Sequence, residues 1–224
     1  MGISERRDRE KKDRQYQILA ATQELILEEG VESLSMQMIA DRVEISKATL
    51  YLSFLNKEAI LREILEAVLC DFVESVNKSI DSSMDGLAAI NTLWTIHLKM
   101  FSRSENLLVI AGIVQYVYPG LLPDMSGVDS EEHRSLFLLR NLITDLVKRG
   151  VQDGSLMADV DPVNVADILI AIESSMLDQV ARQPRRLRNT SRVFVILHDT
   201  FEILLRGIAA DGVDHQLTRL TSSR

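Results

Sequence analysis

The stretch SMQMIADRVEISKATLYLSFLNKEAI, residues 35–60, decides the fold. Ser35 and Ser46 each precede a short run of apolar residues at helical spacing, and a serine hydroxyl is a favourable cap for a first helical turn. Only residues 43–45 separate the two runs. The pattern therefore predicts two short helices joined by a tight turn, a unit that can present its second helix to the major groove of DNA.

The second short helix, predicted over residues 46–54, carries polar groups where a DNA-reading helix needs them. Ser46, Lys47 and Thr49 fall on its first turn, the part that meets base edges. Tyr51 offers a hydroxyl and Lys57 a cation for phosphate contacts, which fix the register on the duplex. A small helical packing unit with a polar surface has the same pattern, so the spacing alone leaves both interpretations open.

Apolar periodicity predicts helices on both sides of this unit. Upstream, a helix is expected over 13–29, ended by Gly30 as a left-handed C-cap. No stretch alternates apolar and β-branched residues with polar ones, so we expect an all-α fold of about nine helices. The downstream helices are predicted over 57–78, 85–103, 106–117, 128–151, 162–182 and 188–210.

The same pattern predicts the organisation of the chain. We expect a helix-turn-helix domain over residues 1–57, a linking helix over 57–78, and a helical domain for ligand binding and dimerisation over 79–224. No internal repeat or low-complexity stretch interrupts these segments.

Composition restricts the class of protein. The 224 residues carry a net charge of −8, which argues against nonspecific nucleic-acid binding. The single cysteine, Cys70, cannot form an internal disulfide and suits a reducing compartment. No apolar run approaches the ~20 residues that span a bilayer, and the charged N-terminus is unlike a signal peptide. We expect a soluble, cytoplasmic protein.

Signatures of catalysis and metal binding are missing from the sequence. It has no glycine-rich phosphate loop, no paired-cysteine metal motif and no G-x-S-x-G elbow. The four histidines are scattered, and none has a glutamate three residues before it, as the helical di-iron proteins require. We therefore expect no catalytic residue, no metal and no cofactor.

The N-terminal run alternates basic and acidic residues. Most such runs are solvated faces or frayed tails, and we favour that interpretation. The alternative is an arm that touches phosphates or the minor groove, with Arg14 as a possible phosphate contact.

A longer set of residues resembles a known family. The set is Ile18-Leu19-Ala20-Ala21, Leu25, Gly30, Ser35-Met36, Ile39-Ala40, Ile45-Ser46-Lys47, Thr49-Leu50-Tyr51, Phe54 and Asn56-Lys57-Glu58. It resembles the tetracycline-repressor (TetR) family over about 45 consecutive residues with consistent spacing. A looser resemblance to the same family lies in residues 150–156, followed by Asp161-Pro162.

This resemblance implies a three-helix DNA-binding domain, a linking helix, and a C-terminal domain that binds a ligand and dimerises. Two residues depart from the family pattern. Glu44 stands where the family usually has a glycine in the turn, and a non-glycine residue at positive φ costs about 1 kcal/mol. Ser53 replaces a frequent histidine or aromatic residue. The family's DNA contacts carry over to Ser35, Gln37, Ser46, Lys47, Ala48, Thr49, Tyr51 and Lys57.

The last two predicted helices, 162–182 and 188–210, are apolar almost all round, so both need cover on a second side. A second copy of the chain is the economical cover. The resulting twofold symmetry would match a palindromic operator on double-stranded DNA. The candidate dimer contacts are Ile168, Ile172, Phe194, Phe201 and Leu205.

Aromatic residues and methionines with few polar groups suit a pocket for an apolar small molecule. Trp94 and His97 share a helix face at i, i+3 and form the best candidate pair. Glu173 interrupts an apolar run, which fits contact with a cationic ligand, a cap contact or a dimer salt bridge. Each candidate also fits an ordinary place in the core. The full set is Trp94, His97, Phe101, Tyr116, Phe137, Asn141, Glu173 and Met176.

These features together predict a repressor that a small, largely apolar effector of unknown identity releases from its operator. One alternative is a ligand-independent activator or nucleoid-organising protein that also binds DNA. A second is a helical ligand-binding or interaction module without DNA function.

Overall fold

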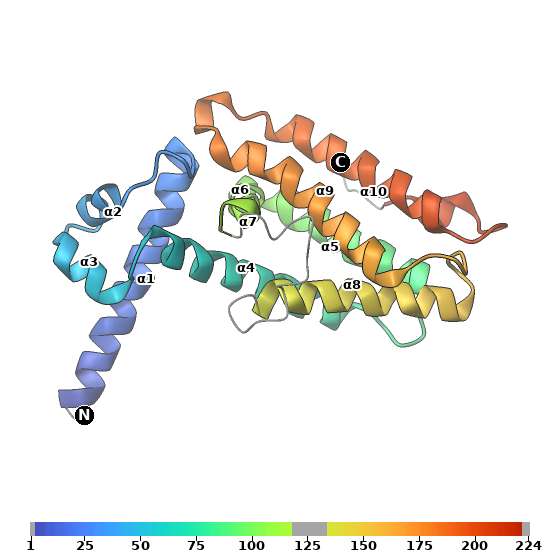
Figure 1. The fold of residues 1–224 in the computed structure, drawn as a ribbon, viewed down its shortest axis with the longest axis horizontal. Coiled ribbons are helices and arrows are strands. Elements are labelled where there is room, and N and C mark those ends of the chain that lie inside the picture. Colours follow the sequence, from blue (N-terminus) through green and yellow to red (C-terminus); the bar gives the residue numbers. More distant parts are fainter. Residues whose placement is uncertain (1–2, 118–133, 221–224) are drawn as a thin grey trace.

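The computed structural model describes residues 3–117 and 134–220, which form helices joined by short turns (Figure 1). At one end of the molecule lie α1 (Ile3–Glu29), α2 (Met36–Arg42) and α3 (Lys47–Ser53). From there α4 (Lys57–Ser79) leads into a larger helical part. That part contains α5 (Gly86–Arg103), α6 (Glu105–Ala111), α7 (Val114–Val117), α8 (Arg134–Asp153), α9 (Pro162–Arg182), η3 (Arg185–Leu187), α10 (Thr190–Ile208) and η4 (His215–Thr218).

The all-α prediction is confirmed. Across the two described ranges, the only β-type pairing is an isolated bridge between Leu156 and Ala209. No helix in those ranges combines the length and the apolar character that crossing a bilayer requires.

Helix boundaries agree with the predicted ones to within about two residues, with three differences. First, α1 begins at Ile3 instead of Asp13, because the alternating charges allow pairs such as Arg6–Glu10 at i, i+4. Second, the segment predicted as one helix over 106–117 is divided at Gly112, where a Cβ would lie only 2.2 Å from the carbonyl oxygen of Leu177. Third, α8 is described only from Arg134, so the predicted residues 128–133 lie outside the described residues.

Side-chain caps begin the short helices as the sequence predicts. Ser35 Oγ accepts a hydrogen bond from the backbone N–H of Met38, and Ser46 Oγ accepts one from that of Thr49. Asn56 caps α4 in the same way, through the N–H of Ala59. Because each cap satisfies a donor that would otherwise lack a partner, α2, α3 and α4 begin at defined residues.

One continuous hydrophobic core joins the two ends of the molecule, and α4 runs through it. Ile60, Leu61 and Leu65 of α4 have no exposed surface, and α4 packs against α1, α5, α6 and α8. Each fully buried side chain of this kind stabilises the fold by about 1.5–3 kcal/mol. The helix that follows α3 is therefore held firmly by the C-terminal helices.

A second junction joins the end of α1 to the end of α9. The Arg188 guanidinium donates to the carbonyl oxygens of Leu27, at 2.7 Å, and Ile26, at 2.5 Å. The N–H of Val31 donates to the carbonyl oxygen of Ala181 at 2.9 Å. At Gly30, φ is +83°, as predicted for a left-handed C-cap, and a Cβ would lie 2.5 Å from the carbonyl oxygen of residue 182. Only glycine fits this position without a shift of the backbone.

Candidate functional site

The exposed face of α3 is the candidate DNA-reading surface. Leu50 is fully buried and anchors the helix in the core, whereas Ser46, Lys47 and Ala48 are exposed. Tyr51, the next residue after Leu50, is 51% exposed. The first turn of α3 and the Tyr51 hydroxyl are thus available to a partner, as a helix that enters a groove requires.

The other predicted contacts lie around this face, but their side chains are partly engaged. Thr49 is half-buried, and its Oγ1 lies 2.8 Å from Ser46 Oγ. Gln37 is exposed and donates from Nε2 to Asp41 Oδ1 at 2.6 Å. Ser35 caps α2. The structure therefore places Ser35 and Gln37 at the start of α2, at the opposite end of that helix from the turn that leads into α3.

Lys57 is less free than the sequence suggests. Its Nζ donates to the carbonyl oxygen of Leu34 at 3.0 Å and lies 4.9 Å from the centroid of the Tyr116 ring. An ammonium group has three donors, so a phosphate contact would have to share it with these partners. Its contact with DNA stays a prediction.

Two exposed leucines near α3 were missed by the sequence analysis. Leu52 is 82% exposed and Leu55 is 80% exposed, next to Tyr51 and just after α3. Apolar side chains on a DNA-reading surface can contact thymine methyl groups. The signal was present in the sequence, because helical spacing from the buried Leu50 and Phe54 directs both leucines away from the core.

The turn between α2 and α3 contains the expected strain. Glu44 has φ +57°, the only positive φ of a non-glycine residue in the described ranges. The turn is closed by the N–H of Glu44 to the carbonyl oxygen of Asp41 and by the N–H of Ile45 to that of Ala40. The prediction that residue 44 adopts a backbone conformation suited to glycine is confirmed.

An ion-pair cluster holds α2 against α1. Arg42 Nη2 lies 2.6 Å from Glu28 Oε2, and Arg42 Nη1 lies 3.3 Å from Glu24 Oε2. The hydrogen bond from Arg42 lowers the pKa of Glu28. All three side chains reach solvent, so the cluster orients α2 more than it stabilises the fold.

The charged N-terminal run forms the first turns of α1, with residues 5–13 exposed. Arg6 pairs with Glu10 at 3.2 Å, and Arg14 is half-buried. A contact of this run with DNA stays a prediction.

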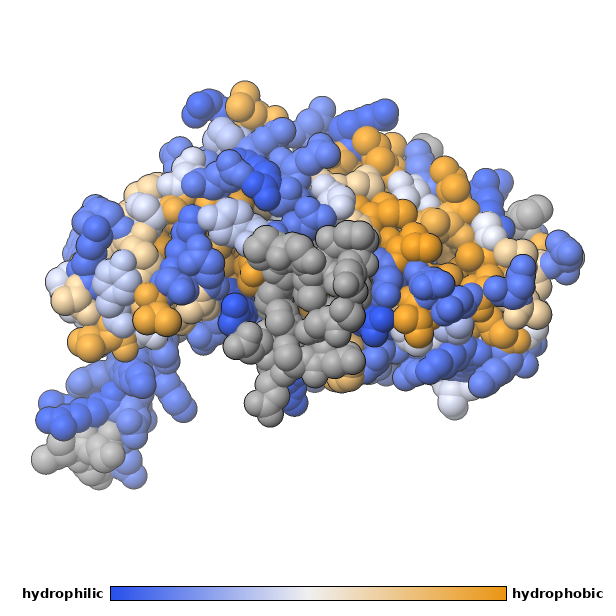
Figure 2. Space-filling view, viewed as in Figure 1, coloured by the Kyte–Doolittle hydropathy of each residue, from blue (hydrophilic) through white to orange (hydrophobic). Residues whose placement is uncertain are grey.

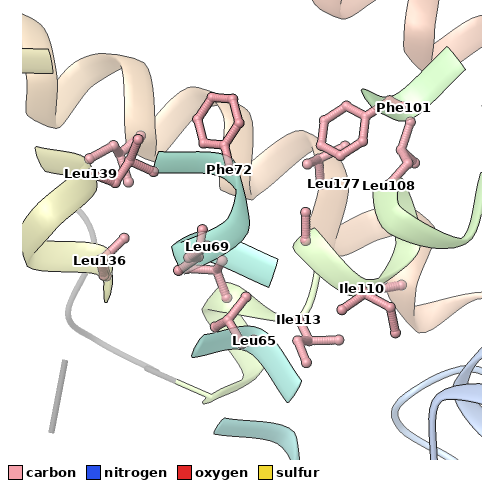
Figure 3. Close-up of a cluster of buried hydrophobic side chains, with 14 of the residues drawn as sticks. Leu65, Leu69, Phe72, Phe101, Leu108, Ile110, Ile113, Leu136, Leu139 and Leu177 are labelled. Carbon is pink, nitrogen blue, oxygen red and sulfur yellow. The ribbon is translucent and has the colours of Figure 1, made fainter. Parts of the chain in front are cut away.

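A cavity of about 40 Å³ lies among the helices of the C-terminal part. Its walls come from α4, α5, α6, α7, α8 and α9, and Figure 3 shows Phe72 of α4, Phe101 of α5, Leu139 of α8 and Leu177 of α9 around this region. Apart from His97, Glu173 and Ser174, the lining is apolar. The lining residues are Val68, Leu69, Phe72, His97, Met100, Phe101, Ala111, Val114, Leu136, Leu139, Ile170, Glu173, Ser174 and Leu177.

His97 and Glu173 meet inside this cavity. His97 Nε2 lies 2.5 Å from Glu173 Oε1, and the two side chains are only 6% and 13% exposed. This partner of Glu173, a histidine of its own chain, differs from the cationic ligand, cap contact and dimer salt bridge considered from the sequence. The cavity therefore combines an apolar wall with one polar pair, the usual composition of a small-molecule site.

Trp94 and His97 were expected to contact the ligand as a pair, but the structure directs Trp94 away from the cavity that His97 lines. The Trp94 ring stacks on Phe201, with centroids 3.9 Å apart and planes at 16°. It lines a separate apolar hollow with Ile168 and Leu204, because it is directed toward α9 and α10. Its centroid is 5.7 Å from that of His97, so it is a neighbour of the polar pair and not part of the cavity wall.

Other predicted ligand residues also lie away from the cavity wall. Tyr116 is at the junction of the two parts, with its ring near Lys57 and 5.9 Å from the Arg182 guanidinium carbon. The other three are half-buried at positions that the cavity lining does not include: Phe137, Asn141 and Met176. Of the predicted set, the structure brings His97, Phe101 and Glu173 together. The lining residues of α4 and α8 that the structure adds, such as Leu69, Phe72 and Leu136, were not predicted, because their helical spacing is also that of core residues.

The outer faces of α9 and α10 expose apolar side chains, and Figure 2 shows orange residues over the region where these helices lie. Ile168 is 49% exposed, and Ile172 and Phe194 are half-buried. By contrast, Phe201 is 0% and Leu205 is 1% exposed. These two residues belong to the core of the protomer, which corrects their assignment to a dimer surface. Further exposed apolar residues of α9, η3 and α10 are Val163, Leu187, Val195, Ile196 and Ile203.

Residues 18–64 match the sequence model of a family described as bacterial regulatory proteins, tetR family. Two curated relatives are similar to the chain. An uncharacterized HTH-type transcriptional regulator of Haemophilus influenzae is 28% identical over 106 residues, which cover 47% of this chain and 56% of that protein. The HTH-type transcriptional repressor KstR2 of Rhodococcus jostii is 26% identical over 153 residues, 67% of this chain and 72% of that protein.

The fold also resembles solved structures. The fatty acid degradation regulator FadR of Bacillus halodurans superposes with a TM-score of 0.62 at 18% identity, over 90% of this chain and 97% of that one. The likeness extends from the helix-turn-helix through the C-terminal helices. By the match to the family model, residues 18–64 form a DNA-binding unit of the tetR family of bacterial regulatory proteins.

Proposed function

We propose that the chain is a homodimeric repressor that a small, largely apolar ligand releases from a palindromic operator. The observation that carries the proposal is the presence of two separate sites on one core. An exposed recognition helix, α3, lies at one end, and an apolar cavity with a single polar pair lies among the C-terminal helices. Such a regulator works on the chromosome, so the proposal places it in the cytoplasm.

The proposal divides the chain by role. Residues 1–57 would bind DNA, and residues 79–224 would bind the ligand and form the dimer. The α4 region, residues 57–78, would connect these two parts. Support for the link comes from α4, which begins directly after α3 and whose Val68, Leu69 and Phe72 line the cavity. A ligand that changes the position of α4 would also change the position of α3.

Release requires a ligand that distinguishes two conformations. A ligand shifts this equilibrium only by the difference between its affinities for the DNA-binding form and the released form. The cavity of about 40 Å³ is well below the 300–1,000 Å³ of typical ligand pockets. The small volume of the cavity supports ligand-driven release. A ligand larger than the cavity would have to spread the surrounding helices, and α4 is one of them.

The test begins with an operator selected from random palindromic DNA or found by genomic footprinting. Binding is then titrated at two salt concentrations, with Lys47→Ala and Tyr51→Phe as variants. Because phosphate contacts release counterions, we expect a steep loss of affinity with salt. Both variants should weaken binding, on the order of fivefold or more, by the size of one charge-assisted hydrogen bond.

Lys148→Ala is the matched control, since it removes a mostly exposed lysine from α8, away from α3. It should leave operator binding unchanged. Equal affinities for the wild type and for both α3 variants, or selection of no preferred DNA sequence, would overturn the proposal.

A further inference from the structure

One nitrogen of the polar pair in the cavity lacks a hydrogen-bond partner. His97 as a whole is 5% exposed, and its Nε2 is engaged by Glu173. Its other ring nitrogen, Nδ1, is buried and has no hydrogen-bond partner in the part of the chain that the structure describes. A buried polar atom without a partner costs about 1–3 kcal/mol, so native proteins rarely keep one.

The aromatic rings around His97 offer Nδ1 no acceptor. The rings of Phe72, Phe101 and Phe201 surround it, with centroids 5.1, 4.3 and 5.9 Å from that of His97. The fourth ring is that of Trp94, whose indole nitrogen is a donor only. A molecule bound in the cavity can therefore supply the acceptor that Nδ1 lacks.

The protonation of the pair follows from its burial. A single proton between Nε2 and Oε1 gives two forms without net charge: imidazolium with carboxylate, or neutral imidazole with carboxylic acid. In both forms Nδ1 carries a hydrogen. The remaining form, in which a neutral histidine donates to an ionised glutamate, would bury a net negative charge among apolar side chains, which is costly. Nδ1–H is therefore a hydrogen-bond donor.

From this geometry we infer the chemical class of the ligand: a neutral, largely apolar molecule that directs one acceptor oxygen, such as a ketone, ester or lactone carbonyl, at Nδ1 of His97. This inference rests on the proposed function for its regulatory meaning. An anionic ligand would lie next to the Glu173 carboxylate, and an alkylammonium ligand has no acceptor to offer.

Phe101 determines the size of molecule that fits. It lines the cavity, and it also lines a groove of about 480 Å³ together with Leu108, Phe194 and Val195. The Phe101 ring thus lies between the buried polar pair and a larger groove of mixed polarity between α5, α6 and α10. A small carbonyl compound enters the cavity by spreading its walls, and a longer ligand extends past Phe101 into the groove.

The test uses the full chain and four probes with the same six-membered ring. They are cyclohexanone, cyclohexane, cyclohexylamine and cyclohexanecarboxylate. Binding is followed by the rise in melting temperature and by the emission of Trp94, the only tryptophan of the chain. We expect cyclohexanone to bind about fivefold more tightly than cyclohexane, the size of one hydrogen bond, and the two charged probes to bind more weakly than either.

The double variant His97→Leu with Glu173→Val removes the donor and the carboxylate together. The new side chains are close in volume to the native ones and leave no buried charge, so the variant should fold. In this variant cyclohexane should bind more tightly than cyclohexanone, because the buried carbonyl then has no donor. His198→Leu is the matched control, because it replaces a half-buried histidine on α10 outside the cavity and should keep the preference for the ketone.

Three results overturn the inference: tighter binding of either charged probe than of the ketone, a ketone preference that survives in the double variant, or binding of none of the four probes. Operator binding by the probe-free wild type is measured in parallel. If the operator is bound but cyclohexanone shows none of the expected binding, the inferred ligand class is wrong and the proposed function is retained. If operator binding is missing, the proposed function fails.

Discussion

At the scale of single residues, the chain keeps one strained position in its DNA-binding unit. Glu44 has φ +57° in the turn that sets α3 relative to α2. The conformation suits glycine, and an L-residue there costs about 1–2 kcal/mol. Its carboxylate also lies in the turn that approaches a polyanion.

Glu44→Gly should stabilise the protein, because it removes the strain at this position. The gain is about 1 kcal/mol, reduced in part by the greater flexibility of glycine in the unfolded chain. This corresponds to a melting temperature about 2–4 °C higher for a chain of this size, measured by thermal denaturation. Glu44→Ala separates strain from charge, since it removes the carboxylate and keeps the positive φ. A melting temperature of the glycine variant no higher than that of the alanine variant would contradict the strain argument.

At the scale of elements, the sequence predicts helices well and side-chain directions less well. The caps at Ser35 and Ser46 and the C-cap at Gly30 were readable because they depend on local chemistry. The direction of Trp94 was not readable, because stacking on Phe201 joins residues more than a hundred positions apart. The same holds for Glu173, whose partner was visible only once α5 and α9 were packed together.

Gly30→Ala should destabilise the protein more than a left-handed glycine alone would explain. Its Cβ would meet the carbonyl oxygen of Arg182 at 2.5 Å, so the substitution strains the junction of α1 and α9 as well as the backbone. Gly154→Ala is the matched control, because φ there is +77° and no atom lies within 4 Å of a Cβ. We expect a loss of about 1–3 kcal/mol beyond that of the control, from denaturant unfolding. Equal losses would show that the close contact has no energetic weight.

Asp153 at the end of α8 makes stability depend on pH. Burial raises the pKa of Asp153, but hydrogen bonds from Ser155 and from the N–H of Gly86 outweigh it, and the pKa lies below its ordinary value. A lowered pKa means that the folded state favours the carboxylate. The stabilisation is complete above the ordinary pKa of about 4 and is lost as the pH falls through the lower pKa of the folded state.

Asp153→Asn should therefore lower stability at pH 7 and reduce the loss of stability between pH 5 and pH 3. Urea unfolding at a series of pH values measures both effects. Asp211→Asn, at an exposed position after α10, serves as the control and should leave the pH profile unchanged. An Asp153→Asn profile parallel to that of the wild type would contradict the assignment.

At the scale of the whole molecule, the proposed dimer should depend on exposed apolar residues of α9 and α10. Ile168 is 49% and Ile203 is 67% exposed. A glutamate at both positions would place charges in an interface that is stabilised by about 25 cal/mol for each Å² of buried apolar surface. We expect Ile168→Glu with Ile203→Glu to shift the protein from dimer to monomer in sedimentation velocity. Operator affinity should fall with it, because two half-sites are then no longer bound together.

Leu138→Glu is the control for the dimer prediction, since Leu138 is an exposed leucine of α8 outside the α9 and α10 surface. It should keep the oligomeric state of the wild type. A double variant that sediments as the wild type does would place the subunit contact elsewhere.

The junction at Gly30 limits how the DNA-binding end can move. Because Gly30 lies against the end of α9, and Arg188 holds the last carbonyl groups of α1, the two helix ends have no room to slide along each other. The motion that remains is a rotation of the DNA-binding end about the contact at Gly30. Glu173 lies about 13 Å before Arg182 along α9, at 1.5 Å per residue. A displacement of α9 at the cavity would therefore be transmitted to the contact between Arg182 and Gly30. In the proposed dimer, a small tilt of α9 at Glu173 would then turn α3 and change its distance from the α3 of the second subunit.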